Sequence, residues 1–200
     1  MSASAPRARN PRGEGGRLRE QLVQAAAEVL DEVGDASLLS VRAIARCAGV
    51  SPTALYLHFP DRDALVAAAV EAGFKAFNEA LLAATRSESD PFAALEATSL
   101  AYLGFAERQP ALYSVLFSAH RPLAPTAEVD PKQGFDGLMV LLRECDPALD
   151  EPEVRELAIA VWSSLHGFAE LRGARPAMGW PPAECYVRRM LAAHVPRPAR

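Results

Sequence analysis

The sequence predicts an all-α protein of about nine helices, in which a small N-terminal helix-turn-helix domain precedes a larger helical domain. Apolar residues recur at spacings of three and four along most of the chain, which is typical of amphipathic helices. Proline and glycine separate these stretches, and no segment alternates in the manner of a strand. With 200 residues, the chain is long enough for one or two domains.

The first predicted helix begins near residue 18 and ends before Gly34, which suits a left-handed C-terminal cap. Its apolar face consists of Leu22, Ala25, Ala26, Val29, Leu30 and Val33. Ser40 then caps a second helix, because a serine oxygen can accept from the free amides of the first turn. Ile44 and Ala45 form the apolar side of that helix.

A third, short helix follows almost at once. Gly49 permits a sharp turn, Ser51 caps the new helix, and Pro52 occupies the first helical position, where proline is tolerated. Two short helices joined in this way present the second as a rod that fits the major groove of DNA. Structural helical hairpins share the local pattern, so spacing alone leaves both interpretations open.

The fourth predicted helix starts near Asp61 and ends at the polar segment 84–90, which is the expected domain boundary. Its apolar positions are Leu65, Val66, Val70, Phe74, Phe77 and Leu81. Beyond a surface loop expected at 118–130, Asp150 and Glu153 are placed to form a capping box. The five later helices are expected at 90–107, 109–117, from 130 onward, at 150–172 and at 182–194.

A longer pattern resembles the N-terminal domain of the TetR (tetracycline-repressor-like) family over about residues 17 to 70. The matching positions are Arg17, Ala25-Ala26, Gly34, Val41-Arg42, Ile44-Ala45, Ala48-Gly49-Val50-Ser51, Leu55-Tyr56, His58-Phe59, Arg62 and Leu65. The resemblance implies double-stranded DNA as a partner. It also implies the DNA-contacting residues Ser40, Arg42, Ser51, Pro52, Thr53, Ala54, Tyr56, Leu57, His58 and Arg62.

The individual roles follow from the matched positions. Arg42 is the best candidate for direct readout, because arginine can bond guanine at two acceptors. Tyr56 and His58 match positions that contact phosphate. Arg62 stands where the family usually has lysine. The carboxylates of its neighbours Asp61 and Asp63 are expected to offset its positive charge. Thr53 replaces a common glycine, which is a mild departure.

The C-terminal half resembles those TetR regulators whose second domain carries a Trp-His-Gly signature. Residues 101–117 fit the first part of that pattern, and Trp162-Ser163-Ser164-Leu165-His166-Gly167 fits the second. Trp162 and His166 share a helix face because they are four residues apart. An effector cavity is expected to be lined by Tyr102, Phe105, Tyr113, Phe117, Met139, Leu142, Trp162 and His166. Plain core packing of the same aromatics is the alternative.

The net charge of −4 is unevenly distributed. The arginines Arg7, Arg9, Arg12, Arg17 and Arg19 lie at the N-terminus, whereas acidic residues collect later. Such an arm is usually solvated, and phosphate contact is the alternative. The expected divisions are a disordered basic arm at 1–16, the DNA-binding domain at 17–62, a connecting helix and linker at 63–88, a ligand-binding and dimerisation domain at 89–195 and a tail at 196–200.

The resemblance predicts a repressor that binds a palindromic operator as a homodimer, formed by helices 150–172 and 182–194. A small apolar or aromatic effector is expected to release it from DNA. Two alternatives stay open: a helical protein-interaction module without sequence-specific DNA binding, and a ligand-independent regulator or activator.

Other classes lack sequence support. The chain has no glycine-rich phosphate loop, no HExxH and no GxSxG, so we expect no enzyme, no catalytic residue and no cofactor. Cys47, Cys145 and Cys185 are far apart, so neither a metal site nor a disulfide is expected. The apolar stretches are shorter than the roughly 20 residues of a membrane span, and the N-terminus lacks the apolar centre of a secretory signal. We expect a cytoplasmic protein with no membrane partner.

Overall fold

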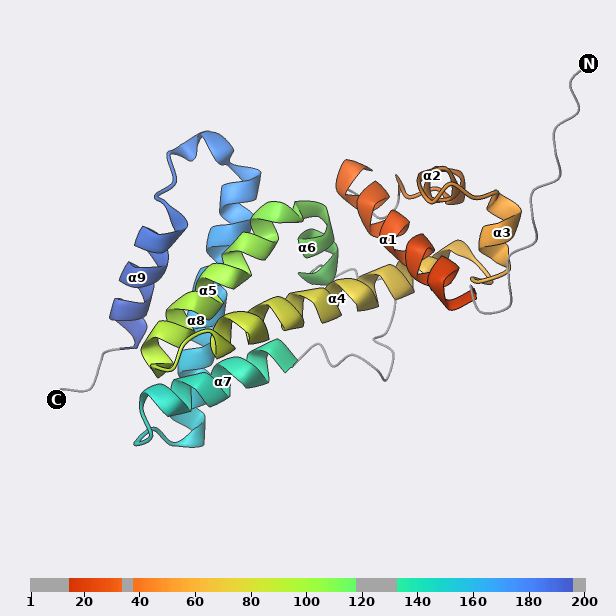
Figure 1. The fold of residues 1–200 in the computed structure, drawn as a ribbon. Coiled ribbons are helices and arrows are strands. Elements are labelled where there is room, and N and C mark those ends of the chain that lie inside the picture. The colour runs from red at the N-terminus through yellow and green to blue at the C-terminus, as the bar shows by residue number, and fades with distance from the viewer. Residues whose placement is uncertain (1–14, 34–37, 118–132, 196–200) are drawn as a thin grey trace, which may run out of the picture.

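The computed structural model describes residues 15–33, 38–117 and 133–195. These ranges contain nine α-helices, a short 3-10 helix between the last two of them, and no strand, so the all-α prediction is confirmed (Figure 1). Gly34, the loop at 118–130 and the arm residues Arg7, Arg9 and Arg12 lie outside the described residues. The helices are α1 (Gly15–Val33), α2 (Val41–Cys47), α3 (Pro52–Tyr56), α4 (Arg62–Arg86), α5 (Pro91–Arg108), α6 (Pro110–Phe117), α7 (Gln133–Cys145), α8 (Glu151–Ala174) and α9 (Ala183–His194).

Side-chain caps fix where five of these helices begin. Ser40, Ser51 and Asp61 accept from the third amide of α2, α3 and α4, at 3.1, 3.2 and 2.7 Å. Asp90 does the same for α5, and Asp150 forms the expected capping box with α8. Each cap satisfies an amide that has no partner within the helix, so the helix starts are specified locally.

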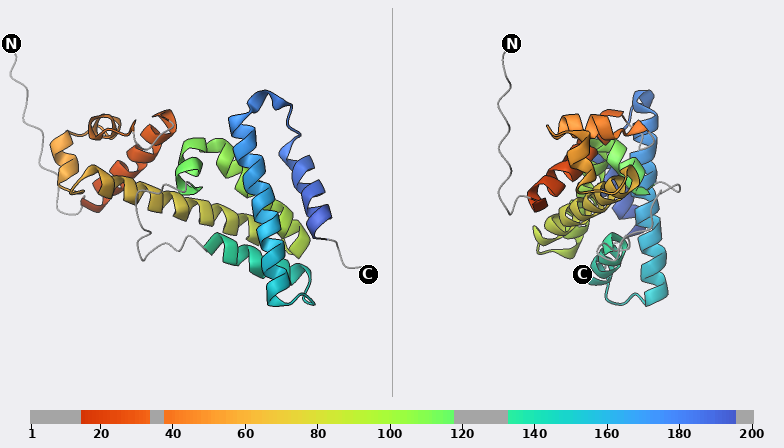
Figure 2. Two further views of the ribbon diagram at one scale, coloured as in Figure 1. Left: turned by 180° about the vertical axis from the view of Figure 1, so that it is seen from behind. Right: turned by 90° about the vertical axis from the view of Figure 1, so that its right-hand side faces the viewer.

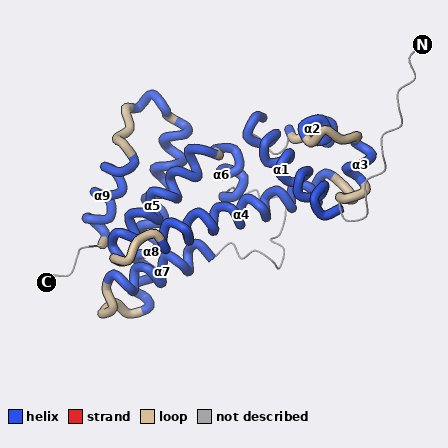
Figure 3. Tube along the Cα trace, viewed as in Figure 1, coloured by secondary structure: helices blue, strands red, loops and turns tan. Residues whose placement is uncertain are grey.

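The helices form two groups joined by α4 (Figures 1 and 2). α1, α2 and α3 gather at one end of the molecule, and α4 leaves this group to run into the second. There α5 packs along α4, α7 and α8 pack together, and α9 lies against α5 and α8. Within the described residues, short loops join α2 to α3, α4 to α5 and α7 to α8, as the tube trace shows (Figure 3). No helix within the described ranges combines the length and apolarity needed to cross a membrane.

α6 packs between the two groups of helices and contacts both α1 and α4. The Leu112 amide donates to the Asp31 carboxylate of α1 at 3.4 Å, and the Leu112 side chain lies on Gly73 of α4. A Cβ at Gly73 would stand 2.8 Å from Leu112 Cδ1. The glycine therefore allows α6 to approach the middle of α4 closely.

Candidate DNA interface and effector cavity

The helix-turn-helix is held by a left-handed turn and a dry core. Gly49 has φ of 69°, and the next amide, of Val50, donates to the Ala45 carbonyl at 2.9 Å. Residues that carry a Cβ avoid this backbone region, so glycine suits the position. Ile44 of α2 and Leu55 of α3 are fully buried, which sets the angle between the two helices.

The residues predicted to contact DNA are mostly exposed. Arg42 near the start of α2 is exposed, and so are Pro52 and Thr53 at the start of α3. Tyr56 and Leu57 are 53% and 81% exposed, although both are large and carry apolar surface. Adjacent exposed residues of this kind leave apolar surface at the end of the predicted DNA-reading helix open to a partner.

The remaining predicted contacts are more closely tied to the domain. Ser40 and Ser51 use their hydroxyl oxygens as helix caps, and Ala54 and His58 are half-buried.

The Arg19 guanidinium, expected in the basic region, lies 5.0 Å from the centre of the Phe59 ring. At this distance the cation is attracted to the ring face and helps to hold α1 on the domain.

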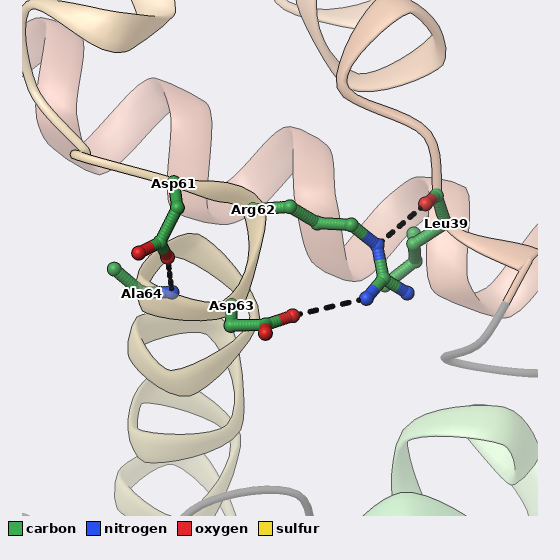
Figure 4. Close-up of polar contacts among 5 residues, drawn as sticks. All are labelled: Leu39, Asp61, Arg62, Asp63 and Ala64. Carbon is green, nitrogen blue, oxygen red and sulfur yellow. Dashed lines mark hydrogen bonds and ion pairs between the residues drawn. The ribbon is translucent and has the colours of Figure 1, made fainter.

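Arg62 has partners inside the domain (Figure 4). Its Nε donates to the Leu39 carbonyl at 2.8 Å, and its Nη1 donates to Asp63 Oδ1 at 3.1 Å. The adjacent Asp61 serves as the cap of α4 through the Ala64 amide. The sequence indicated the acidic neighbours of Arg62 but not the bond to Leu39, which depends on how α4 meets the segment before α2.

The second domain contains a cavity of about 680 Å³ bounded by helices α4 to α8. This volume lies within the usual range for small-molecule sites. Of the eight residues predicted to line it, three do so, namely Tyr102, Phe117 and Trp162. The sequence did not identify the other lining residues, which are Phe74, Phe77, Leu81, Thr98, Ser99, Gly134, Phe135, Asp136, Leu138, Arg155, Ile159 and Leu165.

The other five predicted ligand contacts lie elsewhere in the domain. Phe105 and Leu142 are 3% and 0% exposed and pack in the core. Met139 is half-buried on α7. Tyr113 and His166 bond to each other, and the Tyr102 wall residue bonds to both.

These three residues form a buried polar chain next to the cavity. Tyr113 OH lies 2.6 Å from His166 Nδ1, and Tyr102 OH lies 3.0 Å from Tyr113 OH. Either hydroxyl can donate in the bond between the two phenols, and the tautomer of His166 sets the direction of the bond to Tyr113. No buried side-chain nitrogen or oxygen in the described residues lacks a hydrogen-bond partner, which limits the cost of burying these groups.

Burial also changes the acidity of these phenols. It raises the pKa of Tyr102 to about 12, and the hydrogen bonds from Tyr113 and Trp162 only partly oppose it. The pKa of Tyr113 is raised further, first by burial and then by the neighbouring Tyr102. Both phenols are therefore neutral at physiological pH, so Tyr102 brings no charge to the cavity wall.

Charged groups line the cavity only at exposed positions. Asp136 of α7 and Arg155 of α8 are both exposed, one acidic and one basic. The deeper lining is dominated by buried aromatic rings, among which Phe77 and Tyr102 meet edge to face at 5.3 Å between ring centres. An apolar interior with few polar groups suits an apolar or aromatic molecule.

Metal-binding chemistry has no support in the described part of the chain. It holds no group of three or more His, Cys, Asp or Glu that could bind a metal ion. Cys47 and Cys185 are exposed free thiols, and Cys145 is buried. Burial raises the pKa of Cys145 to about 11, so this thiol is protonated and unreactive at neutral pH.

Comparison with known proteins identifies the family. Residues 22–69 match the model of bacterial regulatory proteins of the tetR family, and residues 95–194 match the tetracyclin repressor-like C-terminal domain. This chain belongs to the tetR family. It is therefore a transcriptional regulator with a helix-turn-helix DNA-binding domain, and the resemblance predicted from the sequence is confirmed.

Among curated relatives, the nucleoid occlusion factor SlmA of Yersinia enterocolitica is 29% identical over 143 residues, covering 69% of each chain. SlmA of Edwardsiella ictaluri is 31% identical over 98 residues, covering 49% of this chain and 50% of that protein. This regulator thus matches about half the length of several SlmA proteins.

Solved structures share the whole fold. A protein of unknown function from Rhodococcus sp. RHA1 has a TM-score of 0.75 and 27% identity, covering 89% of this chain and 95% of that one. The tetR-family regulator PfmR of Thermus thermophilus has a TM-score of 0.66 and 22% identity, covering 90% and 99%. At 22% identity, the similarity to PfmR shows a shared fold and not a shared function.

Proposed function

We propose that this regulator is a repressor that binds a palindromic operator as a homodimer and is released by a small apolar or aromatic effector. The path of α4 carries the proposal. Its first residue, Arg62, bonds to the segment before α2, and its later residues Phe74 and Phe77 line the cavity. A ligand that favours one packing of α4 thereby favours one placement of the helix-turn-helix.

Operator binding is tested by selecting DNA fragments from the genome with the purified protein and footprinting the best site. A protected palindrome is expected, with Arg42→Ala weakening protection at one symmetric base position. Arg86→Ala, at the opposite end of α4, is the matched control and should leave the footprint unchanged. No sequence-selective protection at low salt would favour the alternative of a helical protein-interaction module.

The homodimer is proposed to form through α8 and α9. Ser163, Gly167, Leu171 and Ala174 recur at spacings of three and four on α8, so they share one face. Leu171 is 54% exposed, and a Cβ at Gly167 would touch nothing. Small residues around an exposed leucine allow the same helix of a second copy to approach closely.

The dimer proposal is tested with Leu171→Arg, which places a charge in the centre of the interface. We expect a monomer by light scattering and loss of operator binding. Leu82→Arg, at an exposed leucine of α4, is the control for adding a surface charge. An unchanged molecular mass for Leu171→Arg would show that the protein assembles elsewhere.

Effector binding can be followed through Trp162, because the chain has only one other tryptophan, Trp180. In a Trp180→Phe background, the neutral dye N-phenylnaphthylamine should change the fluorescence of Trp162 as it enters the cavity. Ligands that compete with the dye should also weaken operator binding. If every competing ligand leaves operator binding unchanged, the regulator is ligand-independent; if such ligands strengthen it, the protein is not a ligand-relieved repressor.

A further inference from the structure

The contact between Arg62 and Leu39 joins two segments that are 23 residues apart in the chain (Figure 4). Arg62 is the first residue of α4, and Leu39 directly precedes Ser40, the cap of α2. The Leu39 side chain is 3% exposed, so its backbone is already anchored in the core. The bond to its carbonyl therefore fixes the start of α2 against the start of α4.

We propose that Arg62 is a positioning residue, which contributes to DNA recognition by holding α2 in place and not by contacting phosphate. Two of its donor groups already have partners, Nε on the part-buried Leu39 carbonyl and Nη1 on the exposed carboxylate of Asp63. The Asp63 carboxylate also offsets the positive charge that a phosphate would attract. The Arg62 side chain is 34% exposed, whereas Arg42 on α2 is an exposed residue.

The geometry explains why arginine suits this position. The planar guanidinium group carries one donor at Nε and others at the two Nη atoms. It can therefore donate to a carbonyl and to a carboxylate at the same time. Lysine retains the charge but has donors only at its tip, on a flexible stem. Arg62→Lys therefore keeps the positive charge but loses the guanidinium geometry that allows both hydrogen bonds.

The test measures operator affinity across a range of salt concentrations for Arg62→Lys and Arg62→Gln, with Arg86→Gln as the control. A hydrogen bond from a charged group contributes an amount equivalent to about tenfold in an equilibrium constant. We expect both Arg62 variants to bind about tenfold more weakly, with the salt dependence unchanged. Arg86→Gln should match the wild type.

The phosphate-contact model gives a different pattern. The logarithmic salt slope would flatten by about 0.9 for each phosphate that Arg62→Gln no longer neutralises, and Arg62→Lys would bind like the wild type. Either result, or unchanged affinity in both variants, would overturn the proposal. If Arg62→Gln fails to fold, Arg62→Lys decides alone, because it keeps charge and length.

Hydrogen exchange provides a readout that does not require DNA. The amides of Ala43 and Ile44 donate to Ser40 in the first turn of α2, at 3.1 and 3.0 Å. Both should exchange faster in Arg62→Lys, while amides within α5, such as that of Leu103, keep their protection. Unchanged exchange at the start of α2 would show that Arg62 does not hold it.

Discussion

The helix-turn-helix and the second domain differ in how completely their interiors are packed. Ile44 and Leu55, which join α2 and α3 to the core, are fully buried. In the second domain the helices border a partly open cavity of about 680 Å³, and Ile159 and Trp162 on its wall are 48% and 39% exposed. Substitutions in the first region should therefore reduce stability, whereas those on the cavity wall should reduce ligand affinity with little loss of stability.

The largest expected effect is that of Leu55→Ala in the packed region. Removing a fully buried leucine side chain leaves a cavity and should lower the free energy of unfolding by about 2–5 kcal/mol, measured by urea denaturation. Leu57→Ala, two residues later and 81% exposed, should change it by less than about 0.5 kcal/mol. Similar losses in both variants would contradict the assigned packing of α3.

Alkaline pH should destabilise the second domain through Tyr102. Burial raises the pKa of Tyr102 from 10.0 to about 12. At pH values below 10.0, the pKa in the unfolded chain, the phenol is neutral in both states and its full contribution to stability is present. That contribution is lost as pH rises from 10.0 to about 12. Unfolding free energies measured across this window should fall less steeply in Tyr102→Phe. Parallel pH profiles for the two proteins would refute the burial of this phenol.

Ser51 allows capping and DNA contact to be separated. Ser51→Ala removes the cap of α3 and should cost about 1 kcal/mol of stability. Ser51→Asp retains a capping oxygen, so its unfolding free energy should stay within about 0.5 kcal/mol of the wild type. Its negative charge should nevertheless weaken operator binding, measured by fluorescence anisotropy. Wild-type affinity in Ser51→Asp would mean that the start of α3 faces away from phosphate.

Ile159→Ala on the cavity wall should have only a small effect on stability. Because the side chain is half-exposed, we expect a loss of less than about 1 kcal/mol, together with weaker binding of N-phenylnaphthylamine. Val161→Ala, two residues along α8 and fully buried, should cost about 2 kcal/mol. Equal costs would indicate that the cavity closes in solution.

The helix-turn-helix was predictable because each of its features follows a local rule. Ser40 and Ser51 cap the helices that follow them, and Gly49 adopts the left-handed conformation expected of the turn. The apolar positions Ile44 and Leu55 then turn inward because of the helical period. None of these inferences requires knowledge of a distant segment.

The cavity was only partly predictable because its wall is drawn from five helices. Tyr102 and Phe105 are both buried on α5, but only Tyr102 reaches the cavity. Phe135 and Ile159 line it because α7 packs against α8, an arrangement that no local pattern specifies. The partner of Arg62 was unpredictable for a related reason. Every residue has a backbone carbonyl, so the sequence does not indicate which one the side chain will reach.

The close packing of α6 on Gly73 gives α4 a fixed point about which the helix can tilt. Cavity residues such as Phe74 and Phe77 lie on one side of Gly73, and Arg62 lies eleven residues away on the other. At the helical rise, this arm is about 16 Å long, so a tilt of about 10° moves its end by about 3 Å. That displacement is close to the spacing of roughly 3.4 Å between successive base pairs. In the proposed homodimer, a tilt of this size would therefore move the recognition helix of each copy by nearly the length of one base pair.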